Sequence, residues 1–149
     1  MNYEPLTMNI DMNQIRLEII TPEKIAYTDS VDMVVAPSSL GSLGILPRHI
    51  QLFAQLVEGE LKIKKGNEYI YLSIGGGFLE VTKTKVVVLV TRAVNYKALN
   101  EAEILKAKLE AEKVLRERPT GEDLAAAQVT LRRSILDMKI MTRRKRPIH

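Results

Sequence analysis

The sequence predicts an α+β protein, with an antiparallel β-sandwich in residues 13–94 followed by an antiparallel two-helix hairpin in residues 95–149. β-Branched residues and glycines dominate the first part, whereas Ala, Leu, Glu, Lys and Arg dominate the second. Apolar runs in the first part recur about every 8–12 residues with turn residues between them, which is typical of an antiparallel sandwich or barrel. In the second part apolar residues recur at three- and four-residue steps, as in amphipathic helices.

The first strands are expected where apolar runs are bounded by residues that break strands. Residues 15–19 alternate apolar and polar side chains, as in a half-buried strand, and the Thr-Pro-Glu of residues 21–23 ends them. Residues 31–36 and 51–57 are the next two apolar runs, and Pro37 is expected to end the first of them.

Two hairpins are predicted in the rest of the sandwich. Residues 61–72 form the first, with Gly-Asn at 66–67 as its turn, and residues 78–90 form the second around the polar residues 82–85. Between them lie three consecutive glycines, residues 75–77. They lack the lysine and the following helix of a phosphate-binding loop, so a turn or bulge between strands is the favoured interpretation.

The first helix is predicted to begin after Asn100. Asn100 and Glu103 have the spacing of a capping box, in which the Asn side chain accepts an early helix N–H and the Glu side chain reaches back. The residues expected to face the second helix are Ala102, Leu105, Leu109 and Leu115. Pro119 and Gly121 end this helix.

The second helix is predicted to be the longer one. Thr120 and Asp123 offer its cap, and Pro147 ends it. Its expected buried residues are Leu124, Ala127, Leu131, Ile135 and Met138. These stripes are narrow and rich in alanine, so at about 25 cal/mol per Å² of buried apolar surface two helices alone are only marginally stable. A detachable hairpin is therefore expected.

Composition excludes much enzyme chemistry. Of 149 residues 46% are hydrophobic and 27% charged, which is typical of a globular chain. The absence of cysteine rules out thiolate metal sites and cysteine nucleophiles, and with only His49 and His149 a multi-histidine metal site or triad is not expected. No catalytic or metal-binding residues are assigned. Residues 1–13 lack the features of a secretory signal, so a cytoplasmic chain is expected.

The net charge of +4 is unevenly distributed. Residues 1–94 carry 9 Lys and Arg against 10 Asp and Glu, whereas residues 95–149 carry 13 against 8. A basic tail suits nucleic acid, acidic protein or anionic lipid. All seven aromatic residues lie outside the tail, so the tail offers no platform on which nucleic-acid bases could stack. Two alternatives remain, a nucleic-acid-binding β-domain with a basic tail and a sandwich that binds a small ligand.

Three segments carry a resemblance to a known family. Residues 17–22 read Leu-Glu-Ile-Ile-Thr-Pro, residues 41–49 Gly-Ser-Leu-Gly-Ile-Leu-Pro-Arg-His, and residues 75–81 Gly-Gly-Gly-Phe-Leu-Glu-Val. In this order they resemble the epsilon subunit of F-type, bacterial-like ATP synthases over about residues 13–146. Residues 1–12 form an extension without a family counterpart.

The resemblance implies a ten-stranded β-sandwich, a helical hairpin and a non-catalytic subunit of the central stalk without cofactors. Residues 13–94 would join the gamma subunit to the ring of c subunits, at the cytoplasmic face of the bacterial plasma membrane. The expected contacts with the ring are Ser42, Pro47, Arg48 and His49. Ser42 replaces a glutamate that the family often carries.

For the hairpin, the resemblance implies inhibition of ATP hydrolysis through basic residues that meet an acidic loop of a beta subunit in the alpha/beta hexamer. The candidates are Arg132, Arg133, Lys139, Arg143 and Arg144. Some relatives bind ATP at the hairpin through an aspartate and an arginine, whose positions here hold Asn100 and Glu103. Because Glu103 repels phosphate, ATP binding is expected to be weak or absent.

Overall fold

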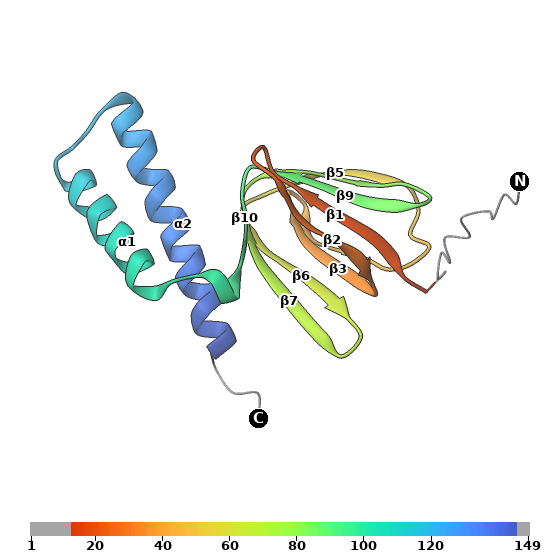
Figure 1. Cartoon of the computed structure of the whole chain (residues 1–149). Helices are drawn as coiled ribbons and strands as arrows, with labels where there is room; N and C mark the ends of the chain where they lie inside the picture. The colour runs from red at the N-terminus through yellow and green to blue at the C-terminus, as the bar shows by residue number, and fades with distance from the viewer. Residues whose placement is uncertain (1–12, 146–149) are drawn as a thin grey trace, which may run out of the picture. The chain divides into compact units, whose positions relative to one another are not determined.

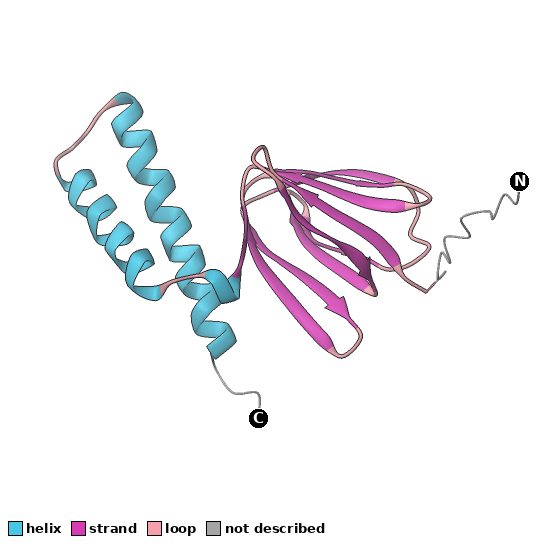
Figure 2. Ribbon diagram, viewed as in Figure 1, coloured by secondary structure: helices cyan, strands magenta, loops and turns pink. Residues whose placement is uncertain are grey.

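The computed structural model describes residues 13–145 and divides the chain after Ala93 into two compact units. The first contains most of the strands and the second both long helices (Figure 1, Figure 2). The predicted extension 1–12, together with Arg146, Pro147 and His149, lies outside the described residues.

Ten strands lie in the described part of the chain, as the family resemblance implied. Their bounds are β1 Ile15–Ile20, β2 Ile25–Val31, β3 Met33–Ser38, β4 Gly41–Ile45, β5 Leu52–Leu56, β6 Gly59–Lys65, β7 Glu68–Ile74, β8 Gly77–Val81, β9 Lys85–Val90 and β10 Ala93–Asn95. Both predicted hairpins are confirmed, as β6–β7 and β8–β9. Of the three glycines, Gly75 and Gly76 connect β7 to β8, and Gly77 is the first residue of β8.

The strands pair in the order β10-β7-β6-β3-β5-β8-β9-β1-β2, and β4 pairs with β3. Antiparallel pairs predominate, as expected, and β1 is an exception, because it runs parallel to β9, with Arg16 opposite Lys85. The sheet curls until β2 approaches β6, and there the Lys65 ammonium of β6 pairs with the Asp29 carboxylate of β2. This curl encloses the core.

Alternation along the strands fills that core. Inward positions of β1 hold Ile15, Leu17 and Ile19, which are 7%, 0% and 0% exposed. The same alternation supplies the other fully buried side chains, which include Val34, Ile45, Leu56, Leu61, Ile63, Ile74, Leu79 and Val88. The sandwich is therefore stabilised by a single contiguous aliphatic cluster.

Three strands were not expected from sequence, namely β2, β4 and β10, and Pro37 lies inside β3 instead of ending it. The Pro37 carbonyl accepts from the Val57 N–H at 2.9 Å. The N–H and C=O groups of one residue point to the same side of a strand. On that side of Pro37, β3 pairs with β6 as far as Val35 and with β5 at Ser38. The missing proline N–H falls in this gap, so no ladder bond is lost.

The second unit is a helical hairpin. A 3-10 turn, η1 (Tyr96–Ala98), precedes α1 (Glu101–Arg116), and α2 (Gly121–Lys145) is the longer helix, as predicted. The Asn100 side chain accepts from the Glu103 backbone N–H at 3.2 Å, which confirms the predicted N-cap.

The stripe predicted for α1 is wrong at three of its four positions, because only Leu115 is half-buried. Ala102, Leu105 and Leu109 are exposed, and the buried residues are Ile104 and Ala111. In α2, Ala127 is buried as expected, but Ile135 is 38% exposed. The fully covered positions of α2 include Ser134, Asp137, Ile140 and Met141.

Small side chains account for part of the difference between the expected and the observed stripes. The buried positions include Ala111, Ala127 and Ser134, and the Ser134 hydroxyl donates to the Thr130 carbonyl at 2.8 Å, which satisfies it inside the hairpin. A count based on large apolar residues selects Leu105 and Leu109 instead, and these remain on the surface.

Candidate functional site

A tight turn places three of the four residues expected to contact the ring. It follows β4, and the His49 backbone N–H donates to the Leu46 carbonyl at 3.2 Å. Pro47 occupies the second position of this four-residue turn and Arg48 the third, with φ +65°. This is the pattern of a type II turn, whose third position favours glycine.

Arg48 is therefore an unusual residue for its backbone. A left-handed φ costs a residue with a Cβ about 1–2 kcal/mol relative to an ordinary conformation. Its side chain is exposed, and the flanking Leu46 and Ile50 are 57% and 77% exposed. His49 is half-buried, with Nδ1 2.8 Å from the Ile50 carbonyl, which accepts when Nδ1 carries the proton. The turn thus presents one cation between two aliphatic side chains.

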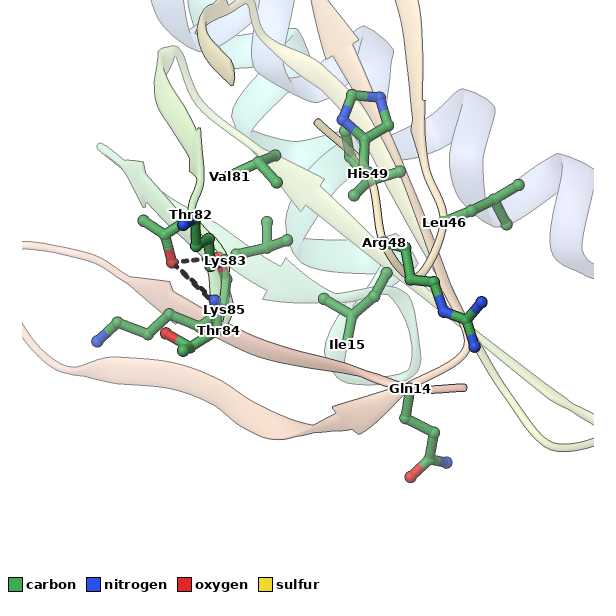
Figure 3. A pocket seen from close by; sticks show the side chains of 12 residues that line it. Gln14, Ile15, Leu46, Arg48, His49, Val81, Thr82, Lys83, Thr84 and Lys85 are labelled. Atoms are coloured by element: carbon green, nitrogen blue, oxygen red, sulfur yellow. Dashed lines mark hydrogen bonds between the residues drawn. The ribbon is translucent and has the colours of Figure 1, made fainter. Parts of the chain in front are cut away.

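A second turn lies beside the first. Residues 82–85 connect β8 to β9, and the Thr82 hydroxyl accepts from the Lys85 backbone N–H at 3.1 Å. A cavity of about 60 Å³ separates the two turns, and both line it. Figure 3 shows Ile15 and Val81 at this cavity, with Arg48 pointing away from it.

Ser42 does not join this group. It is the second residue of β4 and pairs with Pro37, whereas Pro47 lies beyond the other end of the strand. At about 3.3 Å per residue, the three steps from Ser42 to Ile45 alone cover about 10 Å. The structure therefore brings Pro47, Arg48 and His49 together and leaves Ser42 apart from them.

The outer face of β5, β8, β9 and β1 carries an apolar surface that the sequence interpretation missed. Phe53 and Phe78 stack with ring centroids 5.3 Å apart, and Phe78 faces Leu89 across the β8–β9 ladder. The three side chains are 67%, 46% and 50% exposed. Ile20, opposite Leu89, and Pro22 continue the surface as a shallow groove. We call these five residues the apolar face.

Contiguous exposed aromatic and aliphatic surface is typical of a protein contact. Alternation does mark these positions, because Phe53, Phe78 and Leu89 have exposed places between buried neighbours on their strands. What the sequence does not reveal is that the three strands are adjacent, since β5 and β8 are separated by β6 and β7 along the chain.

The five basic candidates of α2 fall on two stripes. At about 100° per residue, Arg132, Lys139 and Arg143 share one stripe, and Arg133 and Arg144 lie about 100° further round. Ile135, Lys139 and Arg143 line a groove that α1 completes with Lys108. Arg132 lines a neighbouring groove, which also includes Ile135. We call Arg132, Lys139 and Arg143 the basic stripe.

The two positions of the degraded ATP motif have structural roles or are solvent-exposed. The Asn100 side chain caps α1, and Glu103 is exposed in its first turn. Asp137, the acidic residue of the second half of α2, is 4% exposed. These acidic and amide groups form no cationic cradle for phosphates.

Residues 13–145 contain neither a candidate metal centre nor a membrane-spanning helix. No group of three or more His, Cys, Asp or Glu side chains is placed to hold a metal ion there. Neither α1 nor α2 has both the length and the apolar character needed to cross a membrane.

Comparisons with known proteins agree with each other. The family model of the ATP synthase Delta/Epsilon chain β-sandwich domain matches residues 14–96. The ATP synthase epsilon chain of Herpetosiphon aurantiacus is 39% identical over 131 residues, which are 88% of this chain and 96% of that protein. That of Dehalococcoides mccartyi strain CBDB1 is 37% identical over 136 residues, 91% of this chain and 97% of its own.

Solved structures share the fold at lower identity. A chain of the Euglena gracilis mitochondrial ATP synthase (OSCP/F1/c-ring) has a TM-score of 0.62 at 20% identity and covers 87% of this chain and 78% of its own. A chain of the Tetrahymena thermophila mitochondrial ATP synthase central stalk and c-ring has a TM-score of 0.55 at 17% identity, covering 85% and 96%. On the match of its sandwich and its likeness to full-length bacterial relatives, this chain belongs to the family of ATP synthase epsilon chains.

Proposed function

We propose that the chain is a non-catalytic rotor subunit, which couples ion flow through a ring of c subunits to ATP synthesis and inhibits ATP hydrolysis through its hairpin. The observation that carries the proposal is the 39% identity to an epsilon chain over 88% of this chain, because that match includes both the sandwich and the hairpin. The proposed position is peripheral, at the cytoplasmic face of the bacterial plasma membrane.

Two surfaces of the sandwich suit two partners. The apolar face, with Phe53 67% exposed, suits the gamma subunit, because burial of aromatic side chains contributes most to protein interfaces. The turn of Pro47, Arg48 and His49 suits the polar loops of the c ring, as the family resemblance implies. A subunit held on both surfaces transmits torque between its partners.

The inhibitory contact is assigned to α2. Arg132, Lys139 and Arg143 lie on one stripe and are exposed, so they can approach an acidic loop of a beta subunit together. Arg133 and Arg144 point to a different side of the helix and serve this contact less well. The hairpin packs through small residues such as Ala111 and Ala127, which is consistent with an element that changes partners.

One pull-down tests the assignment as a whole. The tagged full chain is expressed in the organism that encodes it and is recovered from solubilised membranes. Recovery of alpha, beta, gamma and c subunits supports the rotor function, and their absence contradicts it. Replacement of Phe53 and Phe78 by Ser should reduce recovery of gamma, whereas replacement of the exposed Tyr69, outside the apolar face, should leave it unchanged.

Inhibition is tested separately on the assembled enzyme. Truncation after Pro119 should leave assembly intact and raise ATPase activity. Charge removal on the basic stripe (Arg132, Lys139 and Arg143 to Gln) should do the same, and Arg133→Gln is the matched control on the neighbouring stripe. Unchanged hydrolysis in both the truncated and the triple variant refutes the inhibitory role.

ATP is not proposed as a ligand of the hairpin. Asn100 and Glu103 supply no positive charge where the resemblance requires it, and Glu103 would repel a phosphate. Calorimetry of the full chain with Mg-ATP should detect no binding in the micromolar range. Micromolar affinity would overturn this part of the proposal.

A further inference from the structure

We propose that residues 6–12 of this chain fold back over the apolar face in the free protein and are displaced when a partner binds there. These residues, which we call the cover segment, lie outside the described residues. Their docking site is the groove lined by Ile20, Pro22, Phe78 and Leu89. The inference adds a self-covered state to the function proposed above and rests on that function only for the identity of the displacing partner, the gamma subunit.

The first argument is the pattern of the cover segment. It reads Leu-Thr-Met-Asn-Ile-Asp-Met, so apolar and polar residues alternate without a break. In an extended chain successive side chains point to opposite sides, and one side therefore holds Leu6, Met8, Ile10 and Met12. A segment with one continuous apolar side gains free energy when that side leaves water for an apolar surface.

The second argument is the place where the segment joins the sandwich. β1 starts at Ile15 and runs beside β9 to the apolar face, where Ile20 lies opposite Leu89. At about 3.3 Å per residue, the five steps from Ile15 to Ile20 cover about 17 Å. The eight steps from Gln14 back to Leu6 cover up to about 26 Å. A chain that turns back at Gln14 therefore has the length to bring Leu6 level with Leu89.

The third argument is the order of charged and apolar groups along this path. The cover segment carries one charged residue, Asp11. On β1 and β9, Glu18 pairs with Lys85 at 3.5 Å, and Arg16 is exposed opposite Lys85. None of the nine residues that line the groove farther along the strands is charged. The segment has the same order, because Asp11 lies close to β1 and the apolar Leu6 lies farther from it.

Disulfide trapping tests the docking directly, because the chain has no cysteine of its own. The full chain with Leu6→Cys and Leu89→Cys should form an intramolecular disulfide under mild oxidation. The control combines Leu6→Cys with Tyr69→Cys, because Tyr69 is 44% exposed and Leu89 50%, but Tyr69 lies on β7 outside the apolar face. The Leu6/Leu89 pair should oxidise about tenfold faster, because docking raises the effective concentration of the two thiols.

Binding of an alpha/beta/gamma complex that lacks this subunit measures the displacement. A chain that starts at Met12 should bind about three- to tenfold more tightly than the full chain, because apparent affinity falls with the fraction of chains whose site is covered. The double variant Leu6→Ser, Met8→Ser should gain as much as the truncated chain. The matched variant Thr7→Ser, Asn9→Ser, at the alternate positions, should bind like wild type.

The outcomes separate this inference from the proposed function. If the Leu6/Leu89 pair oxidises no faster than the control, or if the disulfide joins two chains, the segment does not cover its own apolar face and the inference fails. If the truncated chain binds the alpha/beta/gamma complex no more tightly than the full chain, the inference fails while the rotor function stands. If neither chain binds that complex but the intramolecular disulfide forms, the rotor function fails and the self-covered state stands.

Discussion

The carboxylate of Asp32 accepts a hydrogen bond at 2.6 Å from the backbone N–H of Gly66, a residue 34 positions away. Asp32 lies between β2 and β3, and Gly66 lies in the turn of the β6–β7 hairpin with φ +60°. The backbone of Asp32 also donates to the Lys64 carbonyl. One residue thereby holds the hairpin turn to the corner between β2 and β3, next to the β3–β6 ladder.

Removal of that carboxylate should loosen the closure of the sandwich. Asp32→Ala is expected to lower the free energy of unfolding by about 1.5 kcal/mol, since an exposed charge-assisted bond contributes at the lower end of its range. Asp32→Asn keeps an acceptor oxygen and should lose less. Urea unfolding of the full chain measures both, and equal losses would show that charge and not the hydrogen bond is what stabilises the turn.

A second contact near the same corner predicts how stability depends on pH. The ammonium of Lys65, hydrogen-bonded to Asp29, lowers the pKa of Asp29 below its ordinary 3.8, with a further contribution from the Ser30 backbone N–H. The same bond raises the pKa of Lys65 above 10.5. The contribution of Asp29 is therefore complete above about pH 3.8 and disappears as the pH falls through its lowered pKa.

The contribution of Lys65 has the opposite sense, because it is complete below pH 10.5 and disappears as the pH rises through the raised pKa. Both side chains are exposed, so the effect is small and decreases with salt. The difference in urea unfolding between wild type and Asp29→Asn should be largest near pH 7 and should shrink as the pH falls through the lowered pKa of Asp29. A difference that does not change with pH would assign the contact to something other than ionisation.

Gly77 should tolerate no side chain. A Cβ on Gly77 would lie 1.9 Å from the Leu89 carbonyl oxygen, inside the β8–β9 ladder. Gly77→Ala is expected to cost at least about 2 kcal/mol, because the strands must separate. Gly44→Ala is the control in β4, where a Cβ meets nothing within 4 Å, and should be neutral or stabilising. Thermal unfolding distinguishes them, and two equal melting temperatures would contradict the close approach.

Asn100 should stabilise α1 as its N-cap. Asn100→Ala removes the acceptor for the Glu103 N–H and is expected to cost about 1 kcal/mol. Asn100→Asp keeps the acceptor and adds a favourable charge at the helix N-terminus, so it should be neutral or stabilising. Helix content by circular dichroism and urea unfolding measure the effect. Identical stability of the Ala and Asp variants would contradict the capping role.

Local patterns predicted those elements whose partners are close in the chain. The β6–β7 and β8–β9 hairpins follow from alternation and a turn, both of which lie within a few residues. The apolar pattern did not predict β2, because β2 is an edge strand and carries Tyr27, Thr28, Asp29 and Ser30 among its apolar residues. The parallel pairing of β1 with β9 depends on residues about 70 positions apart, which no local pattern encodes.

The candidate site divides in the same way. Pro47, Arg48 and His49 are consecutive, so the motif that marks one marks all three. Lys83 joins them only because the sheet brings the turn of residues 82–85 to the same end. In the hairpin, Ala111 and Ser134 are buried together with the large Ile140, while Leu109 is 52% exposed, so a pattern of large apolar residues does not identify the packed positions.

The parallel pairing of β1 with β9 also delays completion of the sheet during translation. β1 can pair with β2 as soon as both have left the ribosome, but its other edge has no partner until β9, which begins at Lys85, has been made. At about 5–20 residues per second, the intervening residues take roughly 3–13 s to synthesise. During that time a strand of three large aliphatic side chains is open to other chains. A nascent chain arrested between β8 and β9 should therefore recruit a ribosome-associated chaperone. A nascent chain arrested after the α1–α2 hairpin should not.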